Sequence, residues 1–426
     1  MPKGLFSQGM VVLLSEPILF SKLEQILAED FKLVAKNENS EQWYFGGPSV
    51  LISYRPEVNG YITVDLVDKP WPDHMGDPEK EEMLFGAWSM GYFGPFTYPG
   101  GLSHAAQQSW LYEDGGKNAE EHKAFIRIRS SYVLGSDVDK DTPVLPKNYD
   151  PGHEMMFLTK VCQNVLQMSE ALCYFNPNGE CLASDEIVDG LLDRYEKMSM
   201  YPLEIWSNIR LFNFPDSDKW ALMDTVGMGQ LDTIDHEAIF IKGEFDPNDI
   251  VNFFRNTEVF YLNNRGLVFK NGQIVVGPGG VCWQGVAIKE SIAAPPRSVI
   301  RWFPADGSER PEAYLGGLPN YVNKSVDDLD EAEEEEEDDE GKYEFEHKVE
   351  ISVDDYDNDE NDKDEYEEDE TDSQDIEEKE EKQEKEEKEE KEEKEIKAEK
   401  EDKQKEEIKD QDGEEKKGFF KRIFGR

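Results

Sequence analysis

Residues 49–67 read SVLISYRPEVNGYITVDLV, and this stretch decides the fold class. Apolar and polar side chains alternate through 49–54 and again through 61–67, which is the periodicity of two β-strands with one buried face. The residues between them, 56–60, include Pro, Asn and Gly and predict a tight turn. Two strands joined so closely run antiparallel, because a parallel pair needs a crossover of a dozen or more residues.

The segments around this hairpin extend the pattern. We predict a strand at 10–14, a helix at 21–31 and another strand at 39–44. A β-α-β-β-β order with short connections favours an α+β protein, with mixed or antiparallel sheets and packed helices, over a doubly wound sheet. Further along the chain we expect helices at 79–90, 151–172, 185–197 and 246–254, and strands at 123–134, 204–212, 220–226, 237–241, 267–269, 273–276, 286–289 and 298–303.

The composition changes near residue 324. All eight Trp and all four Cys precede it, whereas residues 325–426 hold 19 basic and 50 acidic side chains, or −31 of the chain's net charge of −49. Too few apolar side chains remain in that segment to offset the entropy of folding. We therefore predict a globular body at 1–324, as one unit or as two halves at 1–135 and 150–305, followed by a charged tail.

The tail has three parts. Residues 325–375 are acidic and expected to be disordered, although the strand-like alternation at 343–353 is either a docking strand or chance. Residues 376–410 repeatedly place Glu four positions before Lys, which predicts a lone solvated helix that acts as a spacer.

Residues 416–426 end the chain with five basic side chains and an apolar helical face. This pattern suits weak association with an anionic membrane surface, docking to a partner protein, or contact with the protein's own acidic segments. The anchoring residues would be Phe419, Phe420, Lys421, Arg422, Ile423 and Phe424.

The charge of the chain excludes some classes of protein. A net charge of −49 repels phosphate backbones, so we expect no nucleic-acid partner. No apolar run approaches the ~20 residues of a membrane span, and residues 10–14 are too few for a signal peptide. We expect a cytoplasmic protein, peripheral at the membrane if residues 416–426 bind lipid.

The cysteines indicate neither a disulfide framework nor a metal site. Cys162 lies on an apolar helical stripe, Cys173 and Cys181 flank a turn, and Cys282 stands alone beside a Trp. No pair has the C-x-x-C spacing of zinc or redox motifs. Reduced thiols and no metal are therefore expected.

Several catalytic motifs fail on inspection. His153-Glu154 lacks the second His of a zincin motif, because position 157 is Phe. The glycines at 227–229 lack the third glycine of a dinucleotide fingerprint, and 277–280 lacks the Gly-Lys-Ser/Thr of a P-loop. No cofactor is expected, and the sequence favours a non-enzymatic protein.

The aromatic stretch 85–98 is the most distinctive feature of the body. Trp88, Tyr92 and Phe96, with His104 close behind, either line a groove for a peptide or apolar ligand or fill the core, and we favour the core.

A second candidate lies on one predicted strand. Arg127 and Arg129 share a face and could form a cationic spot that binds a carboxylate or phosphate, or they pair with local acids, which we favour. His122 precedes them and is more often a structural histidine than a catalyst in such a position.

Scattered landmarks give the chain a family resemblance. The segment 11–17 (VVLLSEP), Trp110, the segment 122–126 (HKAFI) and the segment 225–228 (TVGM) resemble those of a bacterial family catalogued as domain of unknown function 4261. The likeness spans roughly residues 8–305 and leaves the tail outside. It implies a bacterial cytosolic α+β protein, and it carries over no catalytic residues because the family has no established activity.

Two functions remain open from the sequence. The first is an interaction or adaptor protein whose body binds a partner protein and whose tail acts as spacer and anchor. The alternative is a small-ligand-binding protein or enzyme that uses the aromatic stretch near 88–110 and the cationic spot at Arg127 and Arg129. We favour the first, because no nucleophile–base, metal or phosphate constellation is present.

Overall fold

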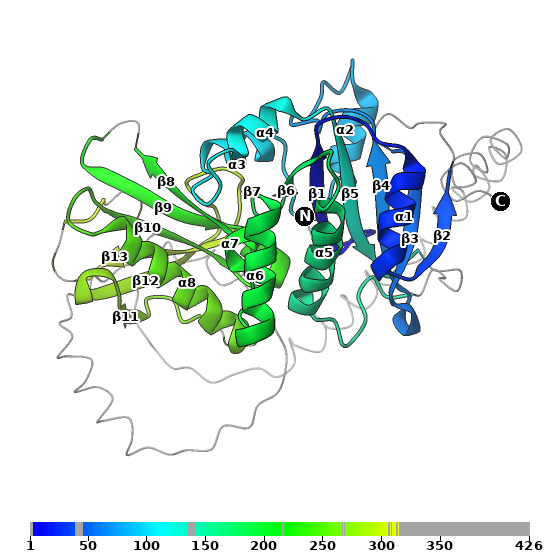
Figure 1. The fold of residues 1–426 in the computed structure, drawn as a ribbon. Coiled ribbons are helices and arrows are strands. Elements are labelled where there is room, and N and C mark those ends of the chain that lie inside the picture. Colours follow the sequence, from blue (N-terminus) through cyan, green and yellow to red (C-terminus); the bar gives the residue numbers. More distant parts are fainter. Residues whose placement is uncertain are drawn as a thin grey trace, which may run out of the picture. The chain divides into compact units, whose positions relative to one another are not determined.

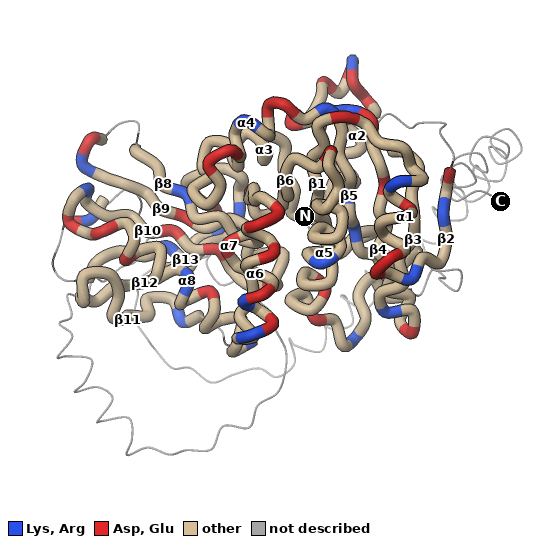
Figure 2. The backbone as a smooth tube through the Cα atoms, in the orientation of Figure 1, with Lys and Arg blue, Asp and Glu red and all other residues tan. Residues whose placement is uncertain are grey.

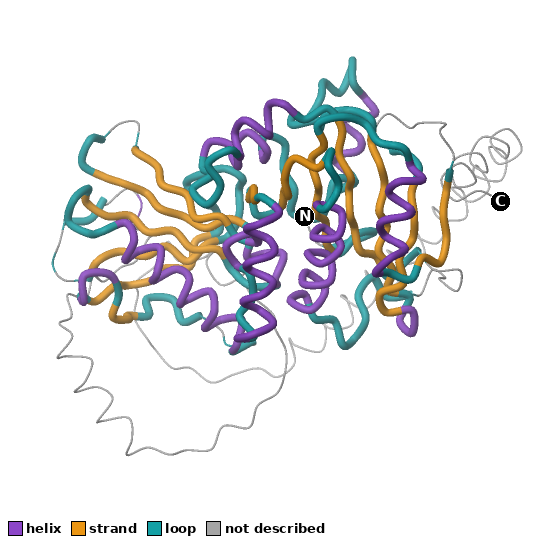
Figure 3. Tube along the Cα trace, in the orientation of Figure 1, coloured by secondary structure: helices purple, strands orange, loops and turns teal. Residues whose placement is uncertain are grey.

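The hairpin of residues 49–67 forms strands β3 (Ser49–Arg55) and β4 (Gly60–Val67), joined by the 3₁₀ turn η1 (Pro56–Val58). The structure is a computed structural model and describes residues 3–38, 46–134, 142–214, 217–265, 267, 269–305, 307, 309–311 and 314. Eight α-helices and two mostly antiparallel sheets are present in these residues, which confirms the predicted α+β class (Figures 1 and 3).

Sheet A has seven strands in the order β2-β3-β4-β5-β1-β6-β7. Its remaining strands are β1 (Gln8–Leu14), β2 (Leu33–Asn37), β5 (Ala124–Ser131), β6 (Ala171–Asn176) and β7 (Cys181–Ala183). All of its neighbouring strands run antiparallel. Central strand β1 is buried along its whole length, because both faces of the sheet are covered.

Helices cover sheet A on both sides. Met10, Val12 and Leu14 of β1 pack towards α1 (Phe20–Asp30), α5 (Pro151–Leu166) and α6 (Asp185–Met198). Val11 and Leu13 alternate to the other face, where α2 (Glu82–Ser89), α3 (Gly101–Gln107) and α4 (Gly115–Glu121) lie. This alternation follows from the two-residue period of a strand.

Sheet B has six strands in the order β11-β12-β13-β10-β9-β8. They are β8 (Asn208–Asn213), β9 (Trp220–Val226), β10 (Asp235–Ile241), β11 (Ile274–Val276), β12 (Cys282–Ile288) and β13 (Val299–Pro304). Helix α8 (Pro247–Asn263) packs Ile250 and Phe254 on one face. The other face holds a smaller apolar cluster and a row of charged side chains, and it is covered in part by the segment 289–298. Only β10 and β13 run parallel.

Several predicted elements differ from the structure; the helix expected at 246–254 runs to Asn263 as α8, and the strand expected at 286–289 begins at Cys282 as β12. The strand expected at 204–212 begins with the short helix α7 (Leu203–Trp206), so that β8 starts at Asn208. The helix expected at 151–172 ends at Leu166, because the following turn leads into β6. The Asn271-Gly272 turn does not pair 267–269 with 273–276; β11 pairs with β12 across the 3₁₀ turn η3 (Pro278–Gly280).

The chain changes sheet between β7 and β8, through α6 and α7. The proposed halves 1–135 and 150–305 therefore do not coincide with the sheets, because sheet A also takes β6 and β7 from beyond residue 150. The strand expected at 39–44 lies outside the described residues, as does the whole tail. Within the part that the structure describes, no helix combines the length and the apolar character needed to cross a bilayer.

Candidate functional site

The aromatic stretch begins within α2, and its side chains Trp88 and Phe93 lie in the core. Trp88 is 2% exposed, and its ring centroid lies 4.3 Å from that of Phe93 and 6.0 Å from that of Trp71. Tyr92 and Phe96 are half-buried. These packed aromatic side chains therefore leave little apolar surface free to line a ligand groove.

The positive charges of Arg127 and Arg129 are compensated by an acidic side chain inside the protein. Asp65 on β4 lies opposite Arg127 in register, and its carboxylate accepts hydrogen bonds from Arg127 Nη2 at 2.6 Å and Arg129 Nη2 at 3.0 Å. Both guanidinium groups also lie over the Tyr92 ring, at 4.4 and 4.6 Å from its centroid. The structure thus brings these three candidate residues together, but in a buried ion cluster.

His122 has a separate environment. Its Nδ1–H donates to the Ala119 carbonyl at 2.5 Å, and its Nε2 accepts from the Trp71 backbone N–H at 2.9 Å. Burial lowers its pKa, so that the ring is neutral and ties the end of α4 to the segment after β4.

His104 has a contact that the sequence does not reveal. It lies on α3, its side chain is 36% exposed, and its Nδ1 is 3.0 Å from Glu180 Oε1. Glu180 belongs to the turn between β6 and β7, has a positive φ of 51° and is 2% exposed. The hydrogen bond to this buried carboxylate raises the pKa of His104.

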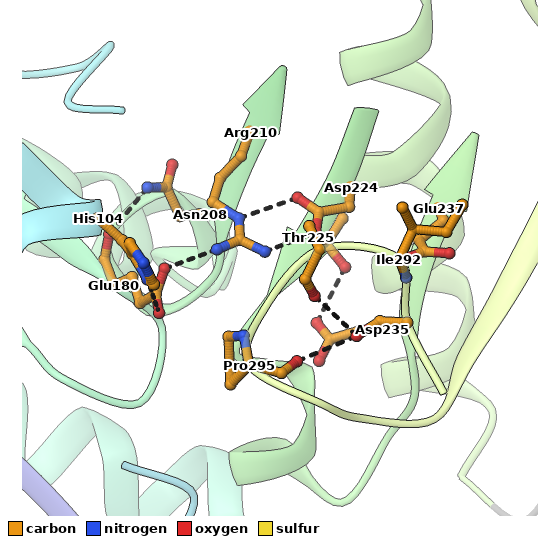
Figure 4. A network of polar contacts seen from close by, with 12 residues as sticks. His104, Glu180, Asn208, Arg210, Asp224, Thr225, Asp235, Glu237, Ile292 and Pro295 are labelled. Carbon is orange, nitrogen blue, oxygen red and sulfur yellow. Dashed lines mark hydrogen bonds and ion pairs between the residues drawn. The ribbon is translucent and has the colours of Figure 1, made fainter. Parts of the chain in front are cut away.

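Glu180 in turn contacts sheet B. Its Oε2 accepts a hydrogen bond from Arg210 Nη1 on β8 at 2.8 Å. Arg210 then forms two bonds with Asp224 on β9, from Nε at 3.0 Å and Nη2 at 2.6 Å. A chain of ionic contacts therefore runs from a half-exposed histidine beside sheet A to the middle of sheet B (Figure 4).

Four charged side chains form a continuous cross-strand row in sheet B. Arg210 pairs in register with Asp224, Asp224 with Glu237 on β10, and Glu237 with Arg301 on β13. All four are 5% exposed or less, and Arg301 Nε donates to Glu237 Oε2 at 2.9 Å. Figure 2 shows blue and red positions within the strands of sheet B.

The segment 289–298 covers this row. Arg297 Nη2 donates to Asp224 Oδ2 at 2.6 Å and to the Thr225 carbonyl at 2.7 Å, and its Nε lies 3.3 Å from Asp235 Oδ2. The Ile292 backbone N–H donates to Glu237 Oε1 at 2.7 Å. Arg297 therefore holds this segment over the carboxylates.

The charges of the network balance when His104 is protonated. Burial raises the pKa of Asp235 and that of Glu237, and the neighbouring arginines oppose the rise. Four carboxylates then face three guanidinium groups and one imidazolium. These groups are Glu180, Asp224, Asp235 and Glu237, with Arg210, Arg297, Arg301 and His104.

A further buried carboxylate lies at the start of α5. Glu154 is fully buried and accepts hydrogen bonds from Ser7 Oγ at 2.9 Å and Tyr149 OH at 2.7 Å. Burial raises its pKa. Its hydroxyl partners satisfy it, and the arrangement holds the chain before β1 against α5.

The thiols and carboxylates of the described residues form no metal-binding cluster. All four cysteines are buried and free. Burial raises the pKa of Cys173 to about 12, so its thiol stays protonated.

What the site can do chemically rests on His104. A histidine whose Nδ1 is held by a buried carboxylate has a raised pKa and keeps its proton to a higher pH than a free imidazole does, with Nε2 on the other side of the ring. The predicted residues Trp88, His122 and Arg127 lie in other environments and do not converge on it.

The sequence offered one signal for the residues that it missed. Asp224 and Arg301 each interrupt a strongly apolar strand, and a charge in such a place needs a partner. Three predicted features of the tail lie outside the described residues: the strand at 343–353, the helix at 376–410 and the anchor of Phe419, Phe420, Lys421, Arg422, Ile423 and Phe424.

Comparison with known proteins gives one family match. The family described as Domain of unknown function (DUF4261) matches residues 224–303. The resemblance stated from the sequence is therefore confirmed over this interval, which contains Asp224, Asp235, Glu237, Arg297 and Arg301. The residues that connect these five side chains to sheet A lie before residue 224, outside the matched interval. No curated protein and no solved structure matches the chain.

Proposed function

We propose that this is a non-enzymatic interaction or adaptor protein, whose body binds a partner protein and whose tail acts as spacer and anchor. The candidate ligand-binding residues support this proposal, because their contacts are with other parts of the protein. Trp88 packs in the core, His122 binds two backbone groups, and Arg127 and Arg129 share Asp65.

The observation that carries the proposal is an exposed aromatic side chain held in place. Trp110 is 70% exposed and its neighbour Leu111 is 46% exposed. The Trp110 indole N–H donates to Gln108 Oε1 at 3.0 Å, and Gln108 Nε2 donates to the Leu211 carbonyl of edge strand β8 at 3.3 Å. A pre-positioned Trp is a frequent anchor in protein interfaces, because it buries a large area with little loss of side-chain entropy.

A pull-down with the full-length chain tests this role. Proteins captured from a lysate would be identified and then re-tested in purified form against the wild type and Trp110→Ala. We expect at least a tenfold loss of affinity in the variant, since an interface hot spot contributes ~2 kcal/mol or more. Leu19→Ala, at a side chain that is 77% exposed, is the control. Equal binding by Trp110→Ala and the wild type would exclude Trp110 as the anchor.

The tail's part in the proposal rests on its sequence. Residues 416–426 combine five basic side chains with four large apolar ones, which supports weak, peripheral association of a cytoplasmic protein with anionic membranes. The full-length protein should sediment with anionic vesicles and not with neutral ones. Deletion of 416–426 should abolish this, and unchanged sedimentation would refute the anchor.

A catalytic alternative has one observation in its favour, the half-exposed His104 oriented by the buried Glu180. In a hydrolase such a pair would supply a general base. Screening the protein against chromogenic esters and phosphate esters tests this idea. Turnover that disappears in His104→Gln would support catalysis over simple binding.

A further inference from the structure

We infer that His104, Glu180 and Arg210 form a protonation-dependent clamp, which fastens α3 to the edge strand of sheet B below neutral pH and releases it as the pH rises. The inference does not depend on the proposed function. It concerns a movement of α3 and β8, whatever the protein binds.

The geometry of Glu180 makes it the centre of the clamp. One carboxylate oxygen is 3.0 Å from His104 Nδ1 and the other is 2.8 Å from Arg210 Nη1. The Glu180 side chain is 2% exposed and that of Arg210 is 1% exposed, whereas that of His104 is 36% exposed. The histidine is therefore the member of the triad that exchanges protons readily with solvent.

Other contacts join the same elements. Asn208 Nδ2 on β8 donates to the Glu180 carbonyl at 2.8 Å and to the Gln108 carbonyl at 3.3 Å. Gln108, which ends α3, contacts the backbone of Leu211 through both ends of its side-chain amide, at 3.3 and 3.4 Å. The amide thus occupies part of the free edge of β8, as a neighbouring strand would.

The charges around His104 set the direction of the response. Glu180 faces it from the β6–β7 turn, Asp73 from the segment before α2, and Arg210 from β8. The two carboxylates favour the protonated ring and Arg210 opposes it. Loss of the proton leaves the buried network with one uncompensated negative charge, which is costly in a low-dielectric interior.

The sign of the pH dependence follows from linkage. Glu180 raises the pKa of His104 above its unfolded value of about 6.5. The stabilisation is therefore fully present below about pH 6.5 and is lost as the pH rises through the higher, folded-state pKa. Above that value α3 should separate more often from β8 and uncover the strand edge that Gln108 occupies.

Amide hydrogen exchange on the full-length protein tests the clamp. Exchange would be measured at about pH 6 and about pH 8.5 and corrected for the intrinsic pH dependence of the chemistry. Peptides covering 101–111 and 208–213 should lose protection at the higher pH, whereas Gln8–Leu14, deep in sheet A, should not. The loss should be about tenfold for each unit by which the pKa of His104 exceeds 6.5.

Two variants distinguish release of the clamp from a general loss of stability at high pH. In His104→Gln the two peptides should exchange rapidly at both pH values. His153→Gln replaces an exposed histidine that bonds Tyr54 OH, and it should keep the wild-type response. A wild-type exchange that does not change with pH, or a response that survives in His104→Gln, would refute the clamp.

A second measurement uses only the wild-type protein, so it does not depend on whether a variant folds. Nuclear magnetic resonance titration of the histidine Cε1–H signals gives the pKa of His104 in the wild-type protein. A value above about 6.5 that matches the exchange midpoint is the expected result. A value at or below 6.5 would overturn the inference.

Discussion

At the scale of single residues, Asp224 is the most heavily engaged carboxylate of the buried row. It accepts hydrogen bonds from Arg210 and Arg297 and is fully buried. Asp224→Asn removes the buried negative charge that two guanidinium groups share, so the variant should lose about 3–5 kcal/mol of unfolding free energy. Asp193→Asn is the control, because Asp193 is 70% exposed and pairs only with Lys197. Urea unfolding measures both, and similar small losses would show that the buried row contributes little.

Two glycines give a matched test of close packing. A Cβ on Gly179 would lie 2.0 Å from the Trp206 carbonyl oxygen, so Gly179→Ala should cost about 1–3 kcal/mol or more through forced backbone shifts. Gly190 lies within α6 and a Cβ there meets nothing within 4 Å. Gly190→Ala should instead stabilise the protein by about 0.5–1 kcal/mol. Thermal unfolding compares the two, and equal effects would contradict the packing seen at Gly179.

His236 should make the protein sensitive to acid. Burial lowers its pKa to about 3, and its Nδ1 accepts from the Trp302 indole N–H at 3.2 Å. As the pH falls below about 6.5 the unfolded chain binds a proton that the folded chain refuses. Its share of the stability is therefore lost between about pH 6.5 and about pH 3, at up to about 1.4 kcal/mol per pH unit. His236→Phe should show a shallower decline of unfolding free energy from about pH 6 to about pH 4. An unchanged slope would contradict this assignment.

At the scale of elements, α6 shows how a cap is chosen. The structure begins this helix at Asp185 and caps it with Ser184, whose Oγ accepts a hydrogen bond from the Ile187 N–H. Ser184→Ala should therefore cost about 1 kcal/mol. Asp185→Ala should cost about 0.3–1 kcal/mol, because only its interaction with the helix dipole is lost. Urea unfolding of the two variants compares the two losses, and a larger loss at Asp185 would contradict the role of Ser184 as the cap.

Local patterns predicted the elements whose burial is periodic. The strands at 10–14, 49–54 and 61–67 and the helix at 21–31 appear within one or two residues of their predicted ends. The periodicity predicted the wrong element where tertiary contacts determine the local structure. Residues 204–206 suit a strand but form part of α7. Pairing around Asn271-Gly272 failed for the same reason, since Gly272 N–H bonds the carbonyl of Gly285 on β12.

The candidate site could be predicted only in part. The pairing of Arg127 and Arg129 with a local acid follows from burying two cations, and Asp65 supplies that acid. The contact between His104 and Glu180 joins residues 76 positions apart, and no spacing rule connects them. It becomes visible only when the β6–β7 turn and α3 are placed together in space.

At the scale of the whole molecule, buried polar contacts connect the two sheets. Gln8 Nε2 of β1 donates to the Gln230 carbonyl at 2.6 Å, and Gln230 Nε2 donates to the Trp206 carbonyl at 2.5 Å. Gln230 lies on η2 (Met228–Leu231), which follows β9. The Gly179 carbonyl accepts from the Asn208 N–H at 3.2 Å. Separating the sheets would leave these groups, and the pair of Glu180 and Arg210, without partners, which is costly for each buried group.

The sheets should therefore unfold as one cooperative unit. Native-state hydrogen exchange in increasing urea would follow the slowest amides of β1 in sheet A and β10 in sheet B. Both sets should converge on the same unfolding free energy and the same urea dependence. Gly179→Ala, which forces the β6–β7 turn away from Trp206, should separate the two sets, whereas Gly190→Ala should not. Two distinct free energies in the wild type would mean that each sheet is stable without the other, and that the buried contacts between them are too weak to couple their folding.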